Sequence, residues 1–219
     1  MKKYTQADFD AFEVIDGIKQ CPSGDYSAIQ VFSDRCSFGE CCSFGEGCSF
    51  GRCCSFGEWC SFSEKCSFGD RCSFGACCSF GEGCSFGRCC SFGEGCSFSE
   101  KCSFGEWCAF GLFCSFGKGC SFDEGCFFGA CCSFGERCSF EGKGEYIGDY
   151  PFLAFVGFGS RIGSKVYFFN LQDGIYVRCG CWLSDIAGFR ERVKAENADA
   201  MYLDLCDLVE RKFNRKNSK

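Results

Sequence analysis

The chain has 219 residues, 46% of them hydrophobic, and a formal net charge of −6, values that fit a folded chain with a sizeable core and exclude disorder throughout. Its composition is abnormal, with 27 Cys, 30 Phe and 30 Gly but no His. Without histidine the chain lacks the commonest general base and the usual catalytic zinc ligands, so we expect neither an enzyme nor a bound cofactor.

The first residues predict a cytoplasmic protein. Polar and charged residues follow Met1 where a secreted protein would carry an apolar signal region. The longest purely apolar run, Phe152 to Val156, is far too short to span a membrane. In a reducing compartment we expect the cysteines to remain thiols, and an odd number of them cannot all pair within one chain.

Residues 1–24 are predicted to form an N-terminal helical cap. Thr5 and Asp8 resemble a capping box, and Phe9, Phe12, Ile15 and Ile18 follow at helical spacing, which predicts a helix over 5–18. A turn at 21–24 then leads into the next segment.

An uninterrupted hexapeptide, Cys-Ser-Phe-Gly-x-x, repeats eighteen times from Cys36 to Glu141. Cys is first and Phe third in every unit. Ser is second except at Ala109 and Phe127, and Gly is fourth except at Ser63, Ser99, Asp123 and Glu141. Alternation in Cys-Ser-Phe predicts a short strand with Cys and Phe inward, and Gly-x-x predicts a corner at which glycine supplies backbone freedom. The six-residue spacing of the aromatic residues continues before the repeats at Tyr26 and Phe32 and after them at Tyr146. We therefore predict a β-solenoid over 25–146.

The pattern small-x-large-Gly-x-x resembles the hexapeptide repeat of left-handed parallel β-helices. This resemblance implies three strands per coil, with Cys in the small inward place and Phe in the large one. Phe in every large place departs from the usual Ile, Leu or Val, and three rings per layer would strain a tight core. A flat solenoid with two strands per coil is the alternative. When every third hexapeptide is placed in the same column, the sixth positions separate into columns of different composition. This favours three strands per coil.

Residues 147–219 have ordinary aliphatic content and are predicted to form a small α+β domain, which we cannot assign to a family. Strands are expected over 150–158, 165–171 and 175–182, with a hairpin at 172–174. Helices are expected over 185–195, with Ser184 as N-cap, and over 199–213. The second helix is expected to turn these residues inward: Tyr202, Leu205, Cys206, Leu208, Val209 and Phe213.

The cysteines are the most prominent chemical groups in the sequence. We interpret those at first positions as buried core, because Cys packs as a small hydrophobe, with a soft-metal or redox array as the alternative. Sixth-position cysteines lie at corners and are the candidates for reactive thiols: Cys41, Cys53, Cys77, Cys89 and Cys131. Cys179 and Cys181 share one face of a predicted strand; core is the preferred interpretation and a metal or redox pair the alternative.

Acidic residues form a column along one predicted corner, comprising Glu46, Glu64, Glu82, Glu100 and Glu136. Together with the corner aromatics Trp59 and Phe113 they are the candidates for contact with a partner. The solenoid lacks the basic stripe that direct nucleic-acid binding requires. The acidic column instead suggests a second hypothesis, an inhibitor that mimics nucleic acid and occupies the binding groove of a DNA- or RNA-binding protein.

The favoured interpretation is a non-enzymatic, rigid scaffold or protein-interaction module, either monomeric or associated through its solenoid. The partner is an unidentified protein, and the C-terminal domain is expected to act as a recognition head. The resemblance to hexapeptide acyltransferases transfers no catalytic residue, because their activity depends on a histidine that this chain lacks.

Overall fold

The computed structural model describes residues 1–129, 131–140, 152–156, 165–179, 182–196 and 198–214. The chain divides into two compact units, Met1–Gly142 and Lys143–Lys219. The predicted cap therefore belongs to the same unit as the repeats. The predicted aromatic at Tyr146 lies outside the described residues.

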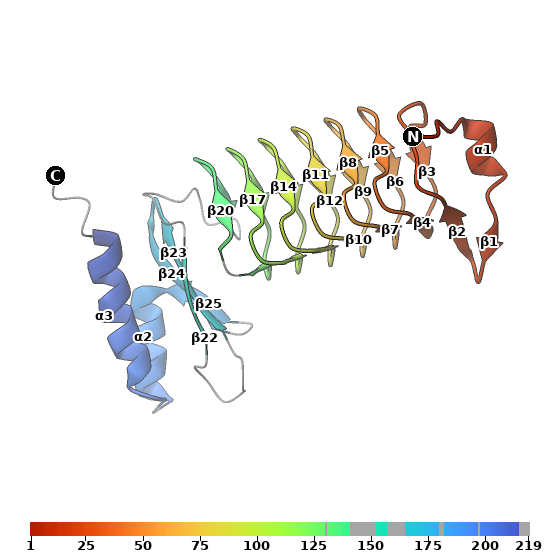
Figure 1. Ribbon diagram of the computed structural model, residues 1–219. Coiled ribbons are helices and arrows are strands. Elements are labelled where there is room, and N and C mark those ends of the chain that lie inside the picture. The colour runs from red at the N-terminus through yellow and green to blue at the C-terminus, as the bar shows by residue number, and fades with distance from the viewer. Residues whose placement is uncertain (130, 141–151, 157–164, 180–181, 197, 215–219) are drawn as a thin grey trace. The chain divides into compact units, whose positions relative to one another are not determined.

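The first unit is a parallel β-solenoid of about seven turns, in which each strand lies beside the strand three hexapeptides further along the chain (Figure 1). Ser73 pairs with Ser55 on one side and with Ser91 on the other, so each turn contains three hexapeptides. This confirms three strands per coil and excludes the flat alternative.

The strands form three sheets, each named here after one of its strands. The β4 sheet contains β1 (Val14–Ile15), β2 (Ile18–Cys21), β4 (Cys36–Phe38), β7 (Ser55–Phe56), β10 (Ser73–Phe74), β13 (Ser91–Phe92), β16 (Ala109–Phe110) and β19 (Phe127–Phe128). The β5 sheet contains β5 (Ser43–Phe44), β8 (Ser61–Phe62), β11 (Ser79–Phe80), β14 (Ser97–Phe98), β17 (Ser115–Phe116) and β20 (Ser133–Phe134). The β6 sheet contains β3 (Val31–Phe32), β6 (Ser49–Phe50), β9 (Ser67–Phe68), β12 (Ser85–Phe86), β15 (Ser103–Phe104), β18 (Ser121–Phe122) and β21 (Ser139–Phe140).

Three columns of phenylalanine fill the solenoid core. Rings from the same sheet in adjacent coils stack in parallel, as Phe68 and Phe86 do with centroids 4.8 Å apart and planes 2° apart. Consecutive rings such as Phe80 and Phe86 meet edge to face, 5.0 Å apart at 85°. Both arrangements are favourable for aromatic pairs. Three rings per layer therefore fit without strain, and Tyr26 and Phe32 extend the columns toward the N-terminus.

Backbone hydrogen bonds join neighbouring coils at three places in each hexapeptide. For example, Ser79 N donates to Cys60 O at 2.9 Å and Gly81 N donates to Phe62 O at 2.9 Å, both toward the preceding coil. At the corner, Cys77 N donates to Glu94 O of the following coil at 2.9 Å. The bonds recur from coil to coil, which locks successive coils in register.

The corners turn at the sixth position and not at the fourth-position glycine, which corrects the prediction. Every described sixth-position residue from Arg35 to Arg137 has a φ between 56° and 79°, whether or not it is glycine. The fourth-position glycines are required for another reason, close approach of the coils. A Cβ on Gly93 would lie 2.6 Å from Ala76 N, inside van der Waals contact with the preceding coil.

The N-terminal segment is a short helix and a hairpin, so the predicted helix over 5–18 is too long. Helix α1 (Gln6–Asp10) has the predicted capping box between Thr5 and Asp8. The chain then turns at Asp16 and Gly17, with φ values of 52° and 75°, and pairs β1 with β2. Asp-Gly is a strong signal for a two-residue hairpin, and it overrides the helical spacing of Ile15 and Ile18.

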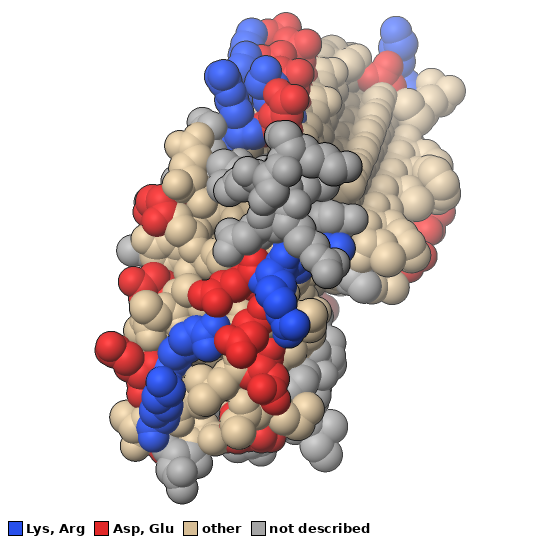
Figure 2. All heavy atoms as spheres, turned by 90° about the vertical axis from the view of Figure 1, so that its left-hand side faces the viewer, with Lys and Arg blue, Asp and Glu red and all other residues tan. Residues whose placement is uncertain are grey.

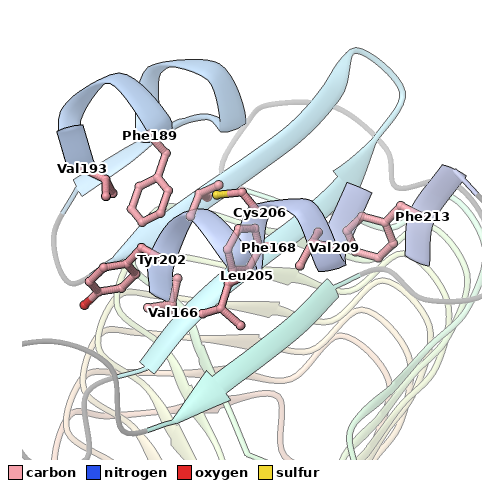
Figure 3. Close-up of a cluster of buried hydrophobic side chains, with 10 residues drawn as sticks. Val166, Phe168, Phe189, Val193, Tyr202, Leu205, Cys206, Val209 and Phe213 are labelled. Atoms are coloured by element: carbon pink, nitrogen blue, oxygen red, sulfur yellow. The ribbon is translucent and has the colours of Figure 1, made fainter. Parts of the chain in front are cut away.

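The second unit is a four-stranded antiparallel sheet with two helices. The strands are β22 (Phe152–Val156), β23 (Lys165–Leu171), β24 (Gly174–Cys179) and β25 (Trp182–Asp185), in that order, followed by α2 (Ile186–Ala195) and α3 (Met201–Asn214). Figure 3 shows side chains of the sheet, such as Val166 and Phe168, meeting Phe189 of α2 and Val209 of α3. The predicted hairpin between β23 and β24 is confirmed.

Three details of this unit differ from the prediction. The expected third strand over 175–182 is two strands, β24 and β25, so the sheet has four strands and not three. The N-cap of α2 is Asp185 in place of Ser184, because Asp185 Oδ1 accepts a 2.7 Å hydrogen bond from Gly188 N. Leu208, expected inside, is 48% exposed, while the other five predicted residues of α3 are buried.

Candidate functional site

The first-position cysteines form three columns inside the solenoid, and their sulfurs are thiols that are nearly all buried. From Cys54 onward each thiol donates to the backbone carbonyl 21 residues earlier, at 3.3 to 3.5 Å. In every case that carbonyl belongs to a fourth-position residue of the hexapeptide phase. Cysteine is therefore more than a small hydrophobe here, since its S–H donates to a part-buried carbonyl at each corner.

Neighbouring thiols along a column also affect one another's ionisation. Interaction with Cys126, and after it burial, raises the pKa of the Cys108 thiol to about 12, against a lowering by Cys90 on its other side. Among the described residues, no group of three or more Cys, Asp or Glu side chains has the arrangement to hold a metal ion. The burial of the columns and their hydrogen bonds to backbone carbonyls fit a structural role.

The thiols should differ sharply in reactivity. Cys41, Cys53, Cys89 and Cys131 are exposed, while the first-position thiols are buried except for the half-buried Cys132. We expect an alkylating reagent to label the four exposed thiols in the folded chain and to label buried ones such as Cys90 at least about a hundredfold more slowly, because labelling there requires opening of the coil. Peptide mapping by mass spectrometry measures this. Rapid labelling of Cys90 would contradict a closed core.

The predicted reactive thiols lie on two different corners. We number the corners by the sheets they join: corner 1 (39–41 and its counterpart in each later coil) follows the β4 sheet, corner 2 (45–47 onward) the β5 sheet, and corner 3 (51–53 onward) the β6 sheet. Cys41, Cys77 and Cys131 are on corner 1, and Cys53 and Cys89 are on corner 3. Cys77 is only half exposed.

The second predicted thiol pair, Cys179 and Cys181, lies in the second unit, and the structure describes only Cys179. Cys179 is half-buried beside the hydrophobic cluster of the second unit, and burial raises the pKa of its thiol. Cys181 lies outside the described residues. Cys179 thus fits the core interpretation.

The predicted acidic column exists, on corner 2, but it is mixed with cations. Glu46 accepts a hydrogen bond from Lys65 at 2.7 Å, which lowers the pKa of its carboxyl, and Glu82 accepts one from Lys101 at 2.5 Å. Lys118 is 3.9 Å from Glu136. All five predicted glutamates, Glu64 and Glu100 among them, share corner 2 with Lys65, Lys101, Lys118 and Arg137. Figure 2 shows acidic and basic side chains next to one another on the face in view.

An apolar patch crosses the outer face of the β4 sheet near the end of the repeat. Its members are Trp107 on corner 3, Ala109 and Phe127 on the sheet, and Leu112 and Phe113 on corner 1. Trp107 and Leu112 are 44% exposed, Phe113 63% and Phe127 41%. We call these five residues the 107–127 patch. Trp107 and Phe127 are in ring contact and Ala109 pairs with Phe127, while Leu112 and Phe113 lie on the corner that follows Ala109 in the chain. Exposed apolar surface of this kind is typical of interaction sites.

The patch gathers the repeat's departures from its own consensus. Ala109 and Phe127 are the only second-position residues that are not Ser, and they pair directly in adjacent strands. Leu112 is the only aliphatic residue larger than alanine at a fifth position. The outward Ser and the corner charge that most other units carry are both missing at this place. This makes the 107–127 patch the candidate site.

Trp107 is held in place within the patch. Its indole covers Gly125, where a Cβ would lie 2.6 Å from two ring atoms. The Phe127 ring lies against it, with centroids 6.3 Å apart at 38°. Gly125 thus provides the space in which the large ring rests, and the patch presents a pre-oriented aromatic side chain, which loses little conformational entropy on binding.

The sequence prediction found part of this site. Phe113 is in the patch, but Trp59 is three coils away on corner 1, and it is 61% exposed. Trp107, Ala109, Leu112 and Phe127 were missed. The sequence contains the information needed to find them. If the outward second, fifth and sixth positions are aligned every three hexapeptides, these unusual residues fall in two neighbouring coils.

Comparison with protein-family models, curated proteins and solved structures gave no significant match. None of the helices in the described part of the chain has the length and apolar character needed to cross a bilayer.

Proposed function

We propose that this protein is a rigid interaction scaffold, whose solenoid presents the 107–127 patch to a protein partner. The observation that carries this proposal is the gathering of exposed aromatic and aliphatic departures on one face of an otherwise regular repeat. Large aromatic side chains at the centre of an apolar surface are the usual anchors of protein interfaces. The three-fold coil also supports membership of the left-handed hexapeptide-repeat β-helices, which we include in the proposal.

The mixed charge of corner 2 supports a scaffold over a nucleic-acid mimic, because a mimic needs carboxylates that cations do not neutralise. The buried, carbonyl-bonded thiols support a structural role over metal binding or redox chemistry. A recognition role for the C-terminal unit remains a prediction, as does a location in the cytoplasm.

The test restores the consensus of the repeat at the patch. The restored triple variant carries Ala109→Ser, Phe113→Gly and Phe127→Ser. Ser is the residue that all other units have at the second position, and Gly occupies the sixth position of several other units with a similar positive φ. We expect affinity purification from the protein's own cells to recover a partner with the parent chain and to lose it with the restored triple variant.

The matched control is Trp59→Gly, which removes an equally exposed corner aromatic outside the patch. Retention of the partner by the control and its loss from the triple variant support the proposal. Recovery of the same proteins with all three chains would overturn it.

A further inference from the structure

Carboxylates border the 107–127 patch on both of its flanking corners. On corner 3, Glu106 precedes Trp107, and Asp123 and Glu124 follow one coil later, with Trp107 N donating to Glu124 O at 2.9 Å. On corner 1, Glu94 is one coil below Leu112, and Gly95 N donates to Leu112 O at 2.8 Å. Asp123, Glu124 and Glu94 are exposed. The patch therefore has an acidic border on both sides.

In the described part of the solenoid, a cation pairs with one of the four border carboxylates, Glu106. Arg88 is the nearest along corner 3, and it faces Glu106 at 3.7 Å. Lys118 and Arg137 belong to corner 2, which does not adjoin the β4 sheet. The arrangement contrasts with corner 2, where lysines bridge the glutamates. An apolar centre with a predominantly acidic border selects for partners of the opposite charge.

We propose that the 107–127 patch binds a polypeptide segment of another protein that carries apolar anchor residues flanked by Lys or Arg. This inference rests on the proposed function and names the chemistry of the partner. A second copy of this chain is a poorer occupant, because pairing two patches would bring Glu106, Asp123, Glu124 and Glu94 of each copy onto an equally acidic surface. A basic segment gains both the burial of its apolar side chains and the attraction of the border.

The experiment uses the full chain and two synthetic amphipathic helical peptides as probes. Both carry Leu on one face; the remaining positions are Lys in the first peptide and Glu in the second. We expect the Leu/Lys peptide to bind, with an affinity that falls as salt rises, and the Leu/Glu peptide not to bind. Fluorescence anisotropy of the labelled peptides measures both affinities.

Two sets of variants separate the apolar centre from the acidic border. The neutral pair Phe113→Gly and Phe127→Ser should weaken the Leu/Lys peptide about thirtyfold, since loss of central aromatic anchors has effects of this size. Neutralising the border with Glu94→Gln, Glu106→Gln and Glu124→Gln should weaken it about tenfold and flatten the salt dependence. The matched control, Glu46→Gln, Glu64→Gln and Glu82→Gln on corner 2, removes the same charge and should leave binding unchanged.

Each failure has a distinct meaning. If the Phe113→Gly and Phe127→Ser pair binds the Leu/Lys peptide as the parent does, the patch is not the docking surface and the proposed function fails with it. If that double variant loses binding but the border variants bind the peptide as well as the corner 2 control does, the patch is still the docking surface. The proposal that its partner is basic is then wrong. The proposal of a basic partner would also be overturned if the Leu/Glu peptide bound equally well. It would be overturned too if sedimentation showed a dimer of the parent chain that the patch variants dissociate.

Discussion

Phe86→Ala is expected to reduce the free energy of unfolding by about 3 to 5 kcal/mol, the range for truncation of a large buried aromatic. Phe86 is 4% exposed and stacks between Phe68 and Phe104, at 4.8 and 4.9 Å. It also meets four further rings edge to face: Phe74, Phe80, Phe92 and Phe98. Removal of the ring leaves a cavity that neighbouring coils cannot fill, because hydrogen bonds hold them in register.

Chemical denaturation followed by circular dichroism measures the change. Phe86→Leu is the matched control, because Leu retains most of the apolar volume and we expect it to cost about 1.5 kcal/mol or less. A cost below about 1 kcal/mol for Phe86→Ala would mean that the aromatic columns do not stabilise the solenoid.

Gly93→Ala is expected to destabilise the solenoid by about 3 kcal/mol, the upper range for overpacking. The added Cβ would lie 2.6 Å from Ala76 N and 2.7 Å from Gly75 C, which are backbone atoms of the preceding coil and cannot rotate away. The fourth position is polar and not glycine at Ser63, Ser99 and Asp123, and Ser63 Oγ compensates for its close approach by donating to Phe44 O at 3.0 Å. Alanine has no such compensation.

The control for this prediction is Gly83→Ala at a sixth position. There the Cβ would meet only Lys65 Cγ at 3.9 Å, and the substitution carries the strain of a φ of 69° alone, about 1 to 2 kcal/mol. The same measurement compares the two. An equal loss for both variants would show that close approach of the coils is not what fixes glycine at the fourth position.

Much of the fold followed from the repeat itself. The period-two pattern placed Cys and Phe inward, and the three-fold phase of the sixth positions identified three strands per coil, as the pairing of Ser73 with Ser91 confirms. These predictions succeeded because every repeat carries the same pattern, so a local preference is repeated many times. In the second unit, the short, nearly continuous apolar run of β23 and the apolar stripe of α3 located a strand and a helix, although Leu208 of that stripe is exposed.

The errors occurred where two local signals competed or where a contact came from another coil. Ile15 and Ile18 fit a helix by spacing, but Asp16 and Gly17 between them form a turn. The role of the fourth-position glycine depends on backbone atoms of the preceding coil, which no local pattern displays. The patch was missed because the three-fold phase was applied to the sixth and fifth positions and not to the second, so Trp107 and Phe127, which meet in stacked coils, were not brought together.

The unfolding free energy of the restored triple variant shows whether the patch residues serve binding or folding. Ala109, Phe113 and Phe127 are all exposed, so replacing them with residues that the repeat uses elsewhere should change stability by no more than about 1 kcal/mol. We therefore predict that chemical denaturation shows a change within this limit, and that the same variant fails to recover the partner in affinity purification. A destabilisation of about 3 kcal/mol or more, as for a core phenylalanine, would show that these residues hold the solenoid together and would contradict the proposed function.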